Sequence, residues 1–190
     1  MMKFKNYDYV AGQEGFLSNS EVELLQRYAG KLPAQPGRLG PDGLTEDKST
    51  RDSVIKWIGN DTEVRWLNDK IFNMVRNTND EFFHMDISMY EDLQHTTYKA
   101  GFGFYGVHMD TFINSSLQRK ISFTIQLSDP KDYEGGDVKI YNNDIKNPYI
   151  ASRSKGSLII FHSMMLHEVT PVTKGVRSSL VGWVSGPPMR

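Results

Sequence analysis

The feature that most constrains the fold is a change of hydrophobic period partway along the chain. Between residues 61 and 79, apolar residues recur every three or four positions, which is typical of an amphipathic helix. From Phe82 onward, short runs of alternating apolar and polar residues are separated by turn residues. Helices followed by many short strands predict an α+β fold, in which helices brace one face of a β-sandwich or jelly roll.

The alternation is clearest between Ile121 and Leu127. Successive side chains of a strand point to opposite faces, so the apolar residues share one face and Ser122, Thr124 and Gln126 share the other. We expect the polar face to line a cavity that binds a polar ligand. The stretch 158–161 is apolar throughout, which is typical of a strand buried on both sides. In the last strand, the same period places four residues on one face: Arg177, Ser179, Val181 and Trp183.

The first part of the chain is expected to support this β region. An edge strand within residues 1–19 is followed by a turn at 11–12, and a helix then begins at a capping box formed by Ser20 and Glu23 and ends at Gly30. Residues 51–58 alternate well enough for a strand. The second helix begins at Asp61-Thr62 and carries one apolar stripe: Val64, Leu67, Ile71, Met74 and Val75.

Residues 33–50 contain three prolines and three glycines and show no periodicity. We expect a mobile surface loop here. A lid over a substrate groove is the alternative interpretation.

Length and composition favour one domain over residues 1–190, with a helical support region at 1–80 and a catalytic jelly-roll core at 81–190. The formal net charge is −1, from 22 basic and 23 acidic residues, so neither a nucleic acid nor an anionic membrane is an expected partner. The absence of cysteine excludes disulfides, thiolate metal sites and cysteine nucleophiles. The polar N-terminal segment has no apolar core, and we expect a soluble cytoplasmic protein.

His108 and Asp110 lie two positions apart on an extended segment, so their side chains point to the same side. If a neighbouring strand brings His167 alongside, two imidazoles and one carboxylate occupy one face of a metal ion. This ligand set leaves other coordination positions open, as in non-haem Fe(II) oxygenases. Each histidine taken singly is more often a hydrogen-bonded structural residue, so the prediction depends on the combined pattern.

Ten residues beyond His167, Arg177 and Ser179 place a guanidinium and a hydroxyl on one strand face. A guanidinium binds a carboxylate through two parallel hydrogen bonds. The order His-x-Asp, then His, then Arg-x-Ser therefore predicts a metal site with a carboxylate clamp nearby.

These motifs carry a family resemblance. Residues 98–190 resemble the catalytic core of the 2-oxoglutarate/Fe(II)-dependent dioxygenases, and most of all the prolyl 4-hydroxylase-like branch. The resemblance covers about half of the chain and implies a double-stranded β-helix, which is a jelly roll. The matching segments are YKAG at 98–101, YGVHMD at 105–110, RKISFTIQLS at 119–128, YEGG at 133–136, GSLIIF at 156–161, LHEVTP at 166–171 and GVRSSLVGWV at 175–184.

The resemblance implies Fe(II) bound by His108, Asp110 and His167, with 2-oxoglutarate and O2 as co-substrates and ascorbate as an optional addition. The far carboxylate of 2-oxoglutarate needs a buried cation, which Arg177 supplies, with hydroxyl donors from Ser179 and Tyr98. Gln126 or Thr124 is expected to contribute from the facing strand. Tyr105 is an alternative to Tyr98 because the intervening segment is rich in glycine and phenylalanine.

Three residues fall on positions that line the substrate groove in prolyl hydroxylase-like relatives: Tyr105, Arg119 and Trp183. Each is equally compatible with a structural role, as a core aromatic or a solvated charge. His162, His84 and His95 have no ligand counterpart in the motif and are expected to be structural. The sequence Glu134-Gly135-Gly136 is interpreted first as a turn and second as a close backbone approach to substrate.

The expected reaction is hydroxylation of an unactivated C–H bond with release of succinate and CO2. Asp110 favours hydroxylation over halogenation, because related halogenases carry a small residue at that position. A prolyl residue in a peptide or protein is the expected substrate. The alternatives are a free amino acid or other small molecule as substrate, and a non-catalytic jelly-roll binding module.

Overall fold

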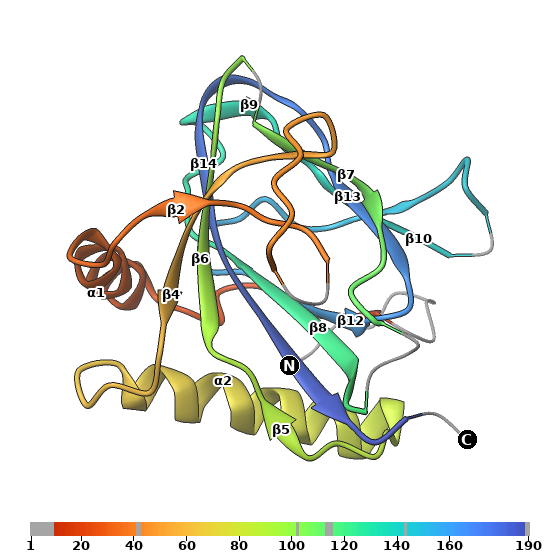
Figure 1. Cartoon of the computed structure of the whole chain (residues 1–190). Coiled ribbons are helices and arrows are strands. Elements are labelled where there is room, and N and C mark those ends of the chain that lie inside the picture. The colour runs from red at the N-terminus through yellow and green to blue at the C-terminus, as the bar shows by residue number, and fades with distance from the viewer. Residues whose placement is uncertain (1–9, 41–42, 102, 113–115, 143, 189–190) are drawn as a thin grey trace.

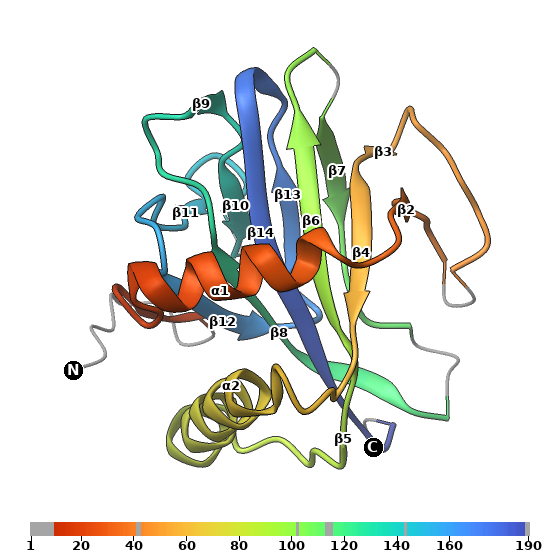
Figure 2. The same cartoon turned by 90° about the vertical axis from the view of Figure 1, so that its left-hand side faces the viewer.

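The chain forms two antiparallel β-sheets, with two helices on the outer side of the larger sheet (Figure 1, Figure 2). The structure is a computed structural model that describes residues 10–40, 43–101, 103–112, 116–142 and 144–188. Two antiparallel sheets facing each other are the architecture of a jelly roll. The predicted α+β jelly roll braced by N-terminal helices is therefore confirmed.

The larger sheet contains nine strands within the described residues, in the order β1-β12-β8-β14-β6-β4-β2, and β5 and β9 pair with β14 off this path. Its members are β1 (Val10–Gln13), β2 (Gln35–Pro36), β4 (Val54–Ile58), β5 (Met89–Tyr90), β6 (Leu93–Lys99), β8 (Gln118–Gln126), β9 (Tyr133–Gly135), β12 (Leu158–His162) and β14 (Val172–Gly186).

The smaller sheet has the order β11-β10-β13-β7-β3, counted over the same residues. Its members are β3 (Arg51–Asp52), β7 (Phe104–His108), β10 (Val138–Tyr141), β11 (Tyr149–Ile150) and β13 (Leu166–Val169). Strands from the first eighty residues thus join both sheets, so the sheets extend beyond the 81–190 range expected for the jelly-roll core.

The alternation in β8 separates two hydrophobic cores. Its apolar face packs beneath the helices in a cluster that includes Phe123, Leu93, Leu180, Leu67 and Ile71. A second cluster lies between the sheets and contains Tyr98, Tyr133, Ile140, Phe161 and Val169. The polar face of β8 points into the space between the sheets, as the sequence predicts.

The helix α1 (Asn19–Gly30) begins two residues earlier than predicted. Its N-cap is Ser18, which forms the capping box with Glu21. The chain contains two overlapping Ser-x-x-Glu patterns, and the prediction chose the wrong one. Starting at Ser18 places Leu17 just before the cap and Val22 four positions after it, and both are buried in the same core. This hydrophobic staple favours the earlier start.

The helix α2 (Arg65–Thr78) also departs from its predicted ends. It begins at Arg65 rather than at Asp61, because the Asp61 carboxylate accepts a hydrogen bond from Tyr28 and does not cap the helix. A short π-helix, Asn79–Phe83, extends it into the region where strands were expected. The apolar stripe of α2 is as predicted, with Leu67, Ile71 and Val75 fully buried.

Two further differences concern the N-terminal strands. The chain remains extended through 11–12, where a turn was predicted, and turns just after β1. The strand predicted at 51–58 is divided at Ser53, because β3 pairs with β7 of the smaller sheet and β4 pairs with β6 of the larger one. Within 33–50, the described residues include β2 and a bridge between Leu39 and Thr45, and 41–42 lie outside the described residues.

No helix among the described residues is both long and apolar enough to cross a bilayer.

Candidate active site

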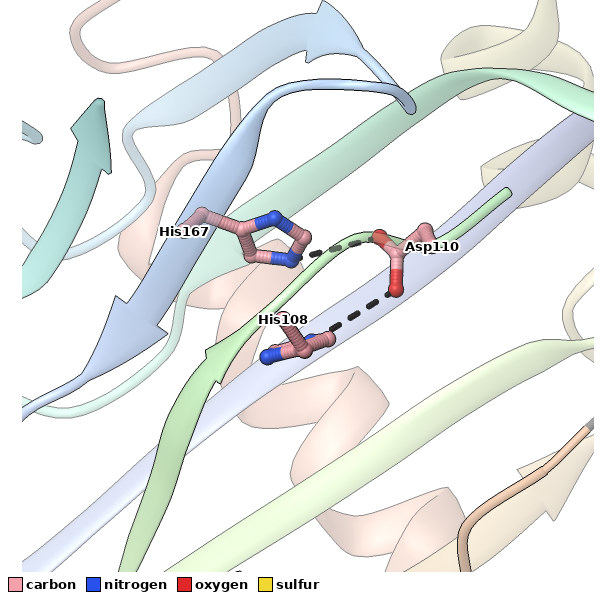
Figure 3. Close-up of side chains that lie close together, drawn as sticks. All are labelled: His108, Asp110 and His167. Carbon is pink, nitrogen blue, oxygen red and sulfur yellow. Dashed lines mark ion pairs between the residues drawn. The ribbon is translucent and has the colours of Figure 1, made fainter. Parts of the chain in front are cut away.

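Three potential metal ligands meet between adjacent strands of the smaller sheet. His167 on β13 lies directly opposite His108 on β7 in the strand register, and Asp110 follows β7 by two residues. One ligand atom from each residue lies within 4.8 Å of the others. His108 Nε2 is 3.6 Å from one Asp110 oxygen, and His167 Nε2 is 3.3 Å from the other (Figure 3). The spacing thus brings the three together as expected, and metal binding by them stays a prediction.

Backbone carbonyl groups orient both imidazoles. His108 Nδ1 is 2.8 Å from the Gly106 oxygen, and His167 Nδ1 is 2.9 Å from the Met165 oxygen. A carbonyl oxygen can only accept, so each Nδ1 carries a proton, and Nε2 is the nitrogen that faces Asp110 and can bind a metal ion once it is unprotonated. This second hydrogen bond is the usual means of fixing a metal-binding imidazole. The donor set therefore fits a divalent ion such as Fe(II).

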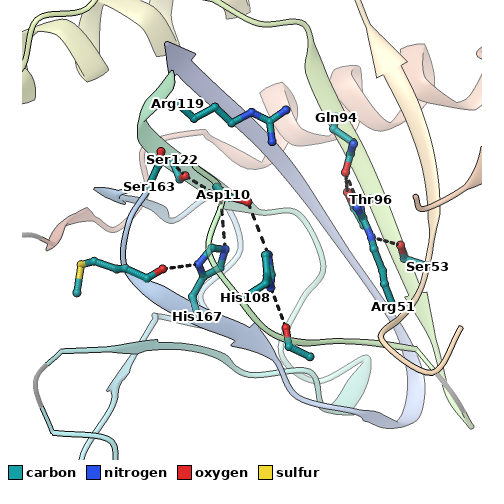
Figure 4. A network of polar contacts seen from close by, with 12 residues as sticks. Arg51, Ser53, Gln94, Thr96, His108, Asp110, Arg119, Ser122, Ser163 and His167 are labelled. Atoms are coloured by element: carbon teal, nitrogen blue, oxygen red, sulfur yellow. Dashed lines mark hydrogen bonds and ion pairs between the residues drawn. The ribbon is translucent and has the colours of Figure 1, made fainter. Parts of the chain in front are cut away.

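Asp110 is held by a network that the sequence prediction missed (Figure 4). Ser122 Oγ donates to Asp110 Oδ2 over 2.7 Å and lies 2.9 Å from Ser163 Oγ. The Asp110 amide donates to the Ser163 carbonyl over 3.0 Å. Ser122 was recognised only as part of a polar strand face, and Ser163 gave no signal, because their contacts join segments far apart in the sequence.

Charge coupling within the triad favours an ionised carboxylate. Burial acts to raise the pKa of Asp110, but the charges and hydrogen bonds of His167 and His108 outweigh it and hold that pKa well below its ordinary range. Burial acts to lower the pKa of His167, yet Asp110 raises it overall. The pKa of His108 is lowered, chiefly by burial, against the opposing effect of Asp110. A metal ion binding here competes with the proton on His167.

Arg177 lies at the other end of the same cavity, on β14, and is only 2% exposed. It pairs in register with Tyr98 on β6, and its guanidinium carbon lies 5.6 Å from the Tyr98 ring centroid. Its Nη1 donates to Ser179 Oγ over 3.4 Å. No ion pair joins Arg177 to a carboxylate within the described residues. A buried cation without an anion fits a site for a ligand carboxylate.

Two neighbours shape the Arg177 pocket. Burial lowers the pKa of Arg177, and Tyr98 and Tyr133 oppose this effect. Gly136 has a positive φ of 65°, and a Cβ there would lie 2.8 Å from Arg177 Cδ. Gly136 therefore permits close packing on Arg177, whereas Gly135 packs against the Pro171 backbone, and Tyr133 is a further residue that the prediction missed.

A small cavity has the three metal ligands at one end and Arg177 at the other. Its lining includes His108, Asp110, His167, Arg177, Ser179, Tyr98, Tyr105, Thr124, Val181 and Trp183. The four residues expected to share a face of β14 all line it. The lining thus combines two imidazoles and a carboxylate with a buried guanidinium, which are the donor types that an elongated dicarboxylate bound to a metal ion would require.

The structure distinguishes the two candidate tyrosines. Tyr98 lies opposite Arg177, whereas the Tyr105 ring stacks on His108 with centroids 3.5 Å apart. Tyr98 is thus the better placed partner for a carboxylate on Arg177. Gln126 donates to the Tyr133 hydroxyl over 2.9 Å and borders Arg177 from a neighbouring cavity.

A groove of about 450 Å³ opens from the metal ligands to the surface. Its lining includes Tyr105, Trp183 and Arg119, the three candidate substrate contacts. The Arg119 guanidinium stacks 3.8 Å from the Trp183 ring and binds Glu91, with the nearest nitrogen–oxygen distance at 2.6 Å. Arg119 is therefore neutralised by its own ion pair, unlike Arg177.

The remaining histidines lie away from this cavity lining. His162 Nδ1 accepts a hydrogen bond from the Met164 amide, and His84 follows the π-helix with a φ of 50°. Burial is the main cause that lowers the pKa of His95 to about 4. A structural role stays a prediction for each of them.

Comparison with known proteins gives a consistent result. Residues 93–185 match the family model of the 2OG-Fe(II) oxygenase superfamily. A PKHD-type hydroxylase from a Synechococcus strain is 38% identical over 91 residues, and one from Gloeothece citriformis is 42% identical over 89 residues. In each case the match covers 46% of this chain but only 39% of the relative. The chain thus spans well under half the length of these curated relatives.

Two solved structures share the fold over nearly the whole chain. A prolyl hydroxylase from Trichoplax adhaerens, in complex with a hypoxia inducible factor peptide fragment, has a TM-score of 0.77 at 20% identity, covering 94% of this chain and 84% of that one. A prolyl-4-hydroxylase from Pseudomonas putida has a TM-score of 0.71 at 22% identity, covering 95% and 93%. At these identities the likeness establishes the fold.

Proposed function

Because residues 93–185 belong to the 2OG-Fe(II) oxygenase superfamily, we propose that the protein is a 2-oxoglutarate- and Fe(II)-dependent dioxygenase that hydroxylates a prolyl residue in a peptide or protein. One observation carries this proposal. A single buried cavity has two histidines and a carboxylate at one end and an arginine without a carboxylate partner, among the described residues, at the other.

The three ligands in this proposal are His108, Asp110 and His167. Two neutral imidazoles and one carboxylate offset one of the two positive charges of the ion and leave other positions open. Ser122 and the two backbone carbonyls keep these ligands oriented before the metal arrives. When bound, iron with 2-oxoglutarate and O2 supplies the chemistry that inserts an oxygen atom into an unactivated C–H bond, with succinate and CO2 as co-products.

Arg177 is proposed to bind the far carboxylate of 2-oxoglutarate. Burial keeps water away from the guanidinium, so a carboxylate there forms strong charge-assisted hydrogen bonds. Ser179 and Tyr98 provide hydroxyl groups beside it, and Gln126 orients Tyr133 on the same side. These residues favour a co-substrate with two carboxylates over one with a single carboxylate.

The substrate class rests on two supports. The named relatives are PKHD-type hydroxylases and prolyl hydroxylases, and one solved neighbour holds a peptide. The groove beside Asp110 has a volume of about 450 Å³ and opens to the surface, and Trp183 and Arg119 contribute to its lining. An open groove favours a peptide or protein substrate over a small molecule.

The test is a turnover assay with Fe(II), 2-oxoglutarate and ascorbate, first with a panel of proline-containing peptides and then with free L-proline. We expect peptide-stimulated release of succinate and a peptide product heavier by one oxygen atom. His167→Ala should give neither. If free proline alone stimulates succinate release, the substrate is a small molecule and not a peptide. If no succinate is released in any condition, the enzymatic function is contradicted.

A further inference from the structure

A second buried guanidinium, that of Arg51, lies beside the metal ligands and has no role in the proposed chemistry. Arg51 is on β3 and is 7% exposed. It lines both the cavity that contains the triad and the groove that leads to the surface. Figure 4 shows it with Ser53, Gln94 and Thr96 as a second polar group, separate from the one around Asp110.

All the hydrogen-bond partners of the Arg51 guanidinium within the described residues are neutral. Nε donates to Ser53 Oγ over 2.9 Å, Nη1 to the Arg38 carbonyl over 3.2 Å and Nη2 to Gln94 Oε1 over 2.7 Å. By contrast, Arg119 in the same groove is neutralised by Glu91. A buried charge is costly unless an opposite charge accompanies it. Among the residues that the structure describes, Arg51 therefore resembles Arg177 in having no carboxylate partner.

The guanidinium is also held in place. A guanidinium has five N–H donors, and three neutral acceptors occupy only part of them, which leaves N–H groups for a ligand. Gly37 packs so closely that a Cβ there would lie 2.6 Å from Arg51 Nε. The side chain is thus fixed before any ligand arrives, which lowers the entropy cost of binding.

The position of Arg51 sets where its ligand would lie. Its guanidinium carbon is 4.6 Å from the centroid of the Tyr105 ring, and the same ring stacks on His108, with centroids 3.5 Å apart. One aromatic ring therefore separates Arg51 from a metal-ligand imidazole. A substrate group bound by Arg51 would therefore lie near the metal ligands.

We propose that Arg51 binds a carboxylate of the substrate, so that the protein acts on substrates with an acidic group next to the hydroxylated residue. This inference rests on the proposed function. The carboxylate can belong to an Asp or Glu side chain of a peptide or to the α-carboxylate of a free amino acid. The open groove on which Arg51 borders favours the acidic side chain of a peptide.

The test measures binding rather than turnover. Mn(II) and 2-oxoglutarate are supplied without O2, and the probe is titrated while tryptophan fluorescence is followed, because Trp183 lines the groove. One pair of probes is a prolyl peptide with Glu directly after the proline and its Gln counterpart. A second pair has Glu or Gln directly before the proline. The third pair is L-proline and L-prolinamide.

We expect wild type to bind the acidic member of at least one pair about tenfold or more tightly than its amide. Arg51→Gln should remove this preference, and Arg51→Lys should keep part of it. Arg65→Gln is the matched control, because Arg65 is an exposed arginine on α2 that lines neither the cavity nor the groove, and it should retain the full preference. A preference in a peptide pair alone identifies a peptide carboxylate, and one in the proline pair alone identifies an α-carboxylate.

Equal binding of acid and amide by wild type in all three pairs would overturn the proposal, even if Arg51→Gln failed to fold. So would a preference that survives in Arg51→Gln. A purely structural role for Arg51 would change the affinity for acid and amide equally. If no succinate is released in any turnover assay but the acid preference depends on Arg51, then the proposed reaction fails and this binding site stands.

Discussion

The two faces of the larger sheet are buried to nearly the same depth but contain different kinds of residue. On the outer face, Phe123 and Ile125 of β8 are fully buried beneath the helices. On the inner face, Ser122 is 1% exposed and Gln126 is 5% exposed, and both form hydrogen bonds within the candidate site. Burial on one face stabilises the fold, and burial on the other shields polar chemistry from water.

The comparison shows how one strand can serve both purposes. Neighbouring residues of β8 belong to different faces, so an apolar residue that anchors the helices alternates with a polar residue that orients a ligand. A shift of register by one residue would exchange the two sets and lose both. Substitutions on the two faces should therefore affect different measurements.

Asp110→Ala should show the largest difference between loss of activity and loss of stability. Loss of the only carboxylate in the triad should abolish turnover and weaken Fe(II) binding, whereas the fold remains intact because the outer core is unchanged. Succinate release and thermal unfolding measure the two effects. Asp69→Ala, at an exposed position of α2, is the control that should retain activity. Retained turnover in Asp110→Ala would overturn the assignment of the ligands.

Phe123→Ala, on the outer face, should have the opposite effect, with a large loss of stability and little change in metal binding. Removing this fully buried ring should lower the free energy of unfolding by about 3–5 kcal/mol. Urea titration measures the loss, and metal affinity of the folded fraction should remain near that of wild type. A large change in metal affinity with little loss of stability would show that the two faces are not separate in function.

Arg177→Ala tests the far end of the cavity. It should raise the 2-oxoglutarate concentration required for half-maximal turnover by about thirtyfold or more, because a buried charge pair contributes about 2–5 kcal/mol to binding. The Fe(II) requirement should change much less, since Arg177 lies away from the triad. An unchanged dependence on 2-oxoglutarate would contradict the carboxylate clamp, and Arg177→Lys shows how much the charge alone contributes.

The smallest effect is expected for Ser122→Ala. Loss of the hydrogen bond to Asp110 should weaken metal binding by about 10- to 100-fold without abolishing turnover at saturating metal. Calorimetric titration with Mn(II) measures this directly. Ser178→Ala is the control, because that hydroxyl contacts Thr97 across the sheet instead of the triad. Equal Mn(II) affinities of Ser122→Ala and wild type would show that Ser122 does not support metal binding.

The sequence was most informative where the signal is local. Period two assigned the faces of β8 and β14, and the two-residue spacing of His108 and Asp110 brought their side chains together. Local competition explains one error, since two Ser-x-x-Glu patterns overlap near Ser18, and the start at Ser18 is the one that places Leu17 and Val22 at staple positions in the same core.

Contacts between distant segments could not be predicted in this way. Arg51 reaches Tyr105 because β3 pairs with β7 and β4 pairs with β6, which required knowledge of where the chain switches sheets. Ser163, in the turn after β12, meets Asp110, which lies just after the end of β7. Neither residue stands in a recognisable pattern, so its role emerges only from the tertiary structure.

The most direct test of the account is an anaerobic titration of the Fe(II)-loaded protein with 2-oxoglutarate, followed in the visible spectrum. If the cavity holds iron on the triad and the far carboxylate on Arg177, wild type should develop the weak charge-transfer band of the chelate, and His167→Ala should not. Absence of the band in wild type with iron demonstrably bound would contradict the account and favour a binding module without this chemistry.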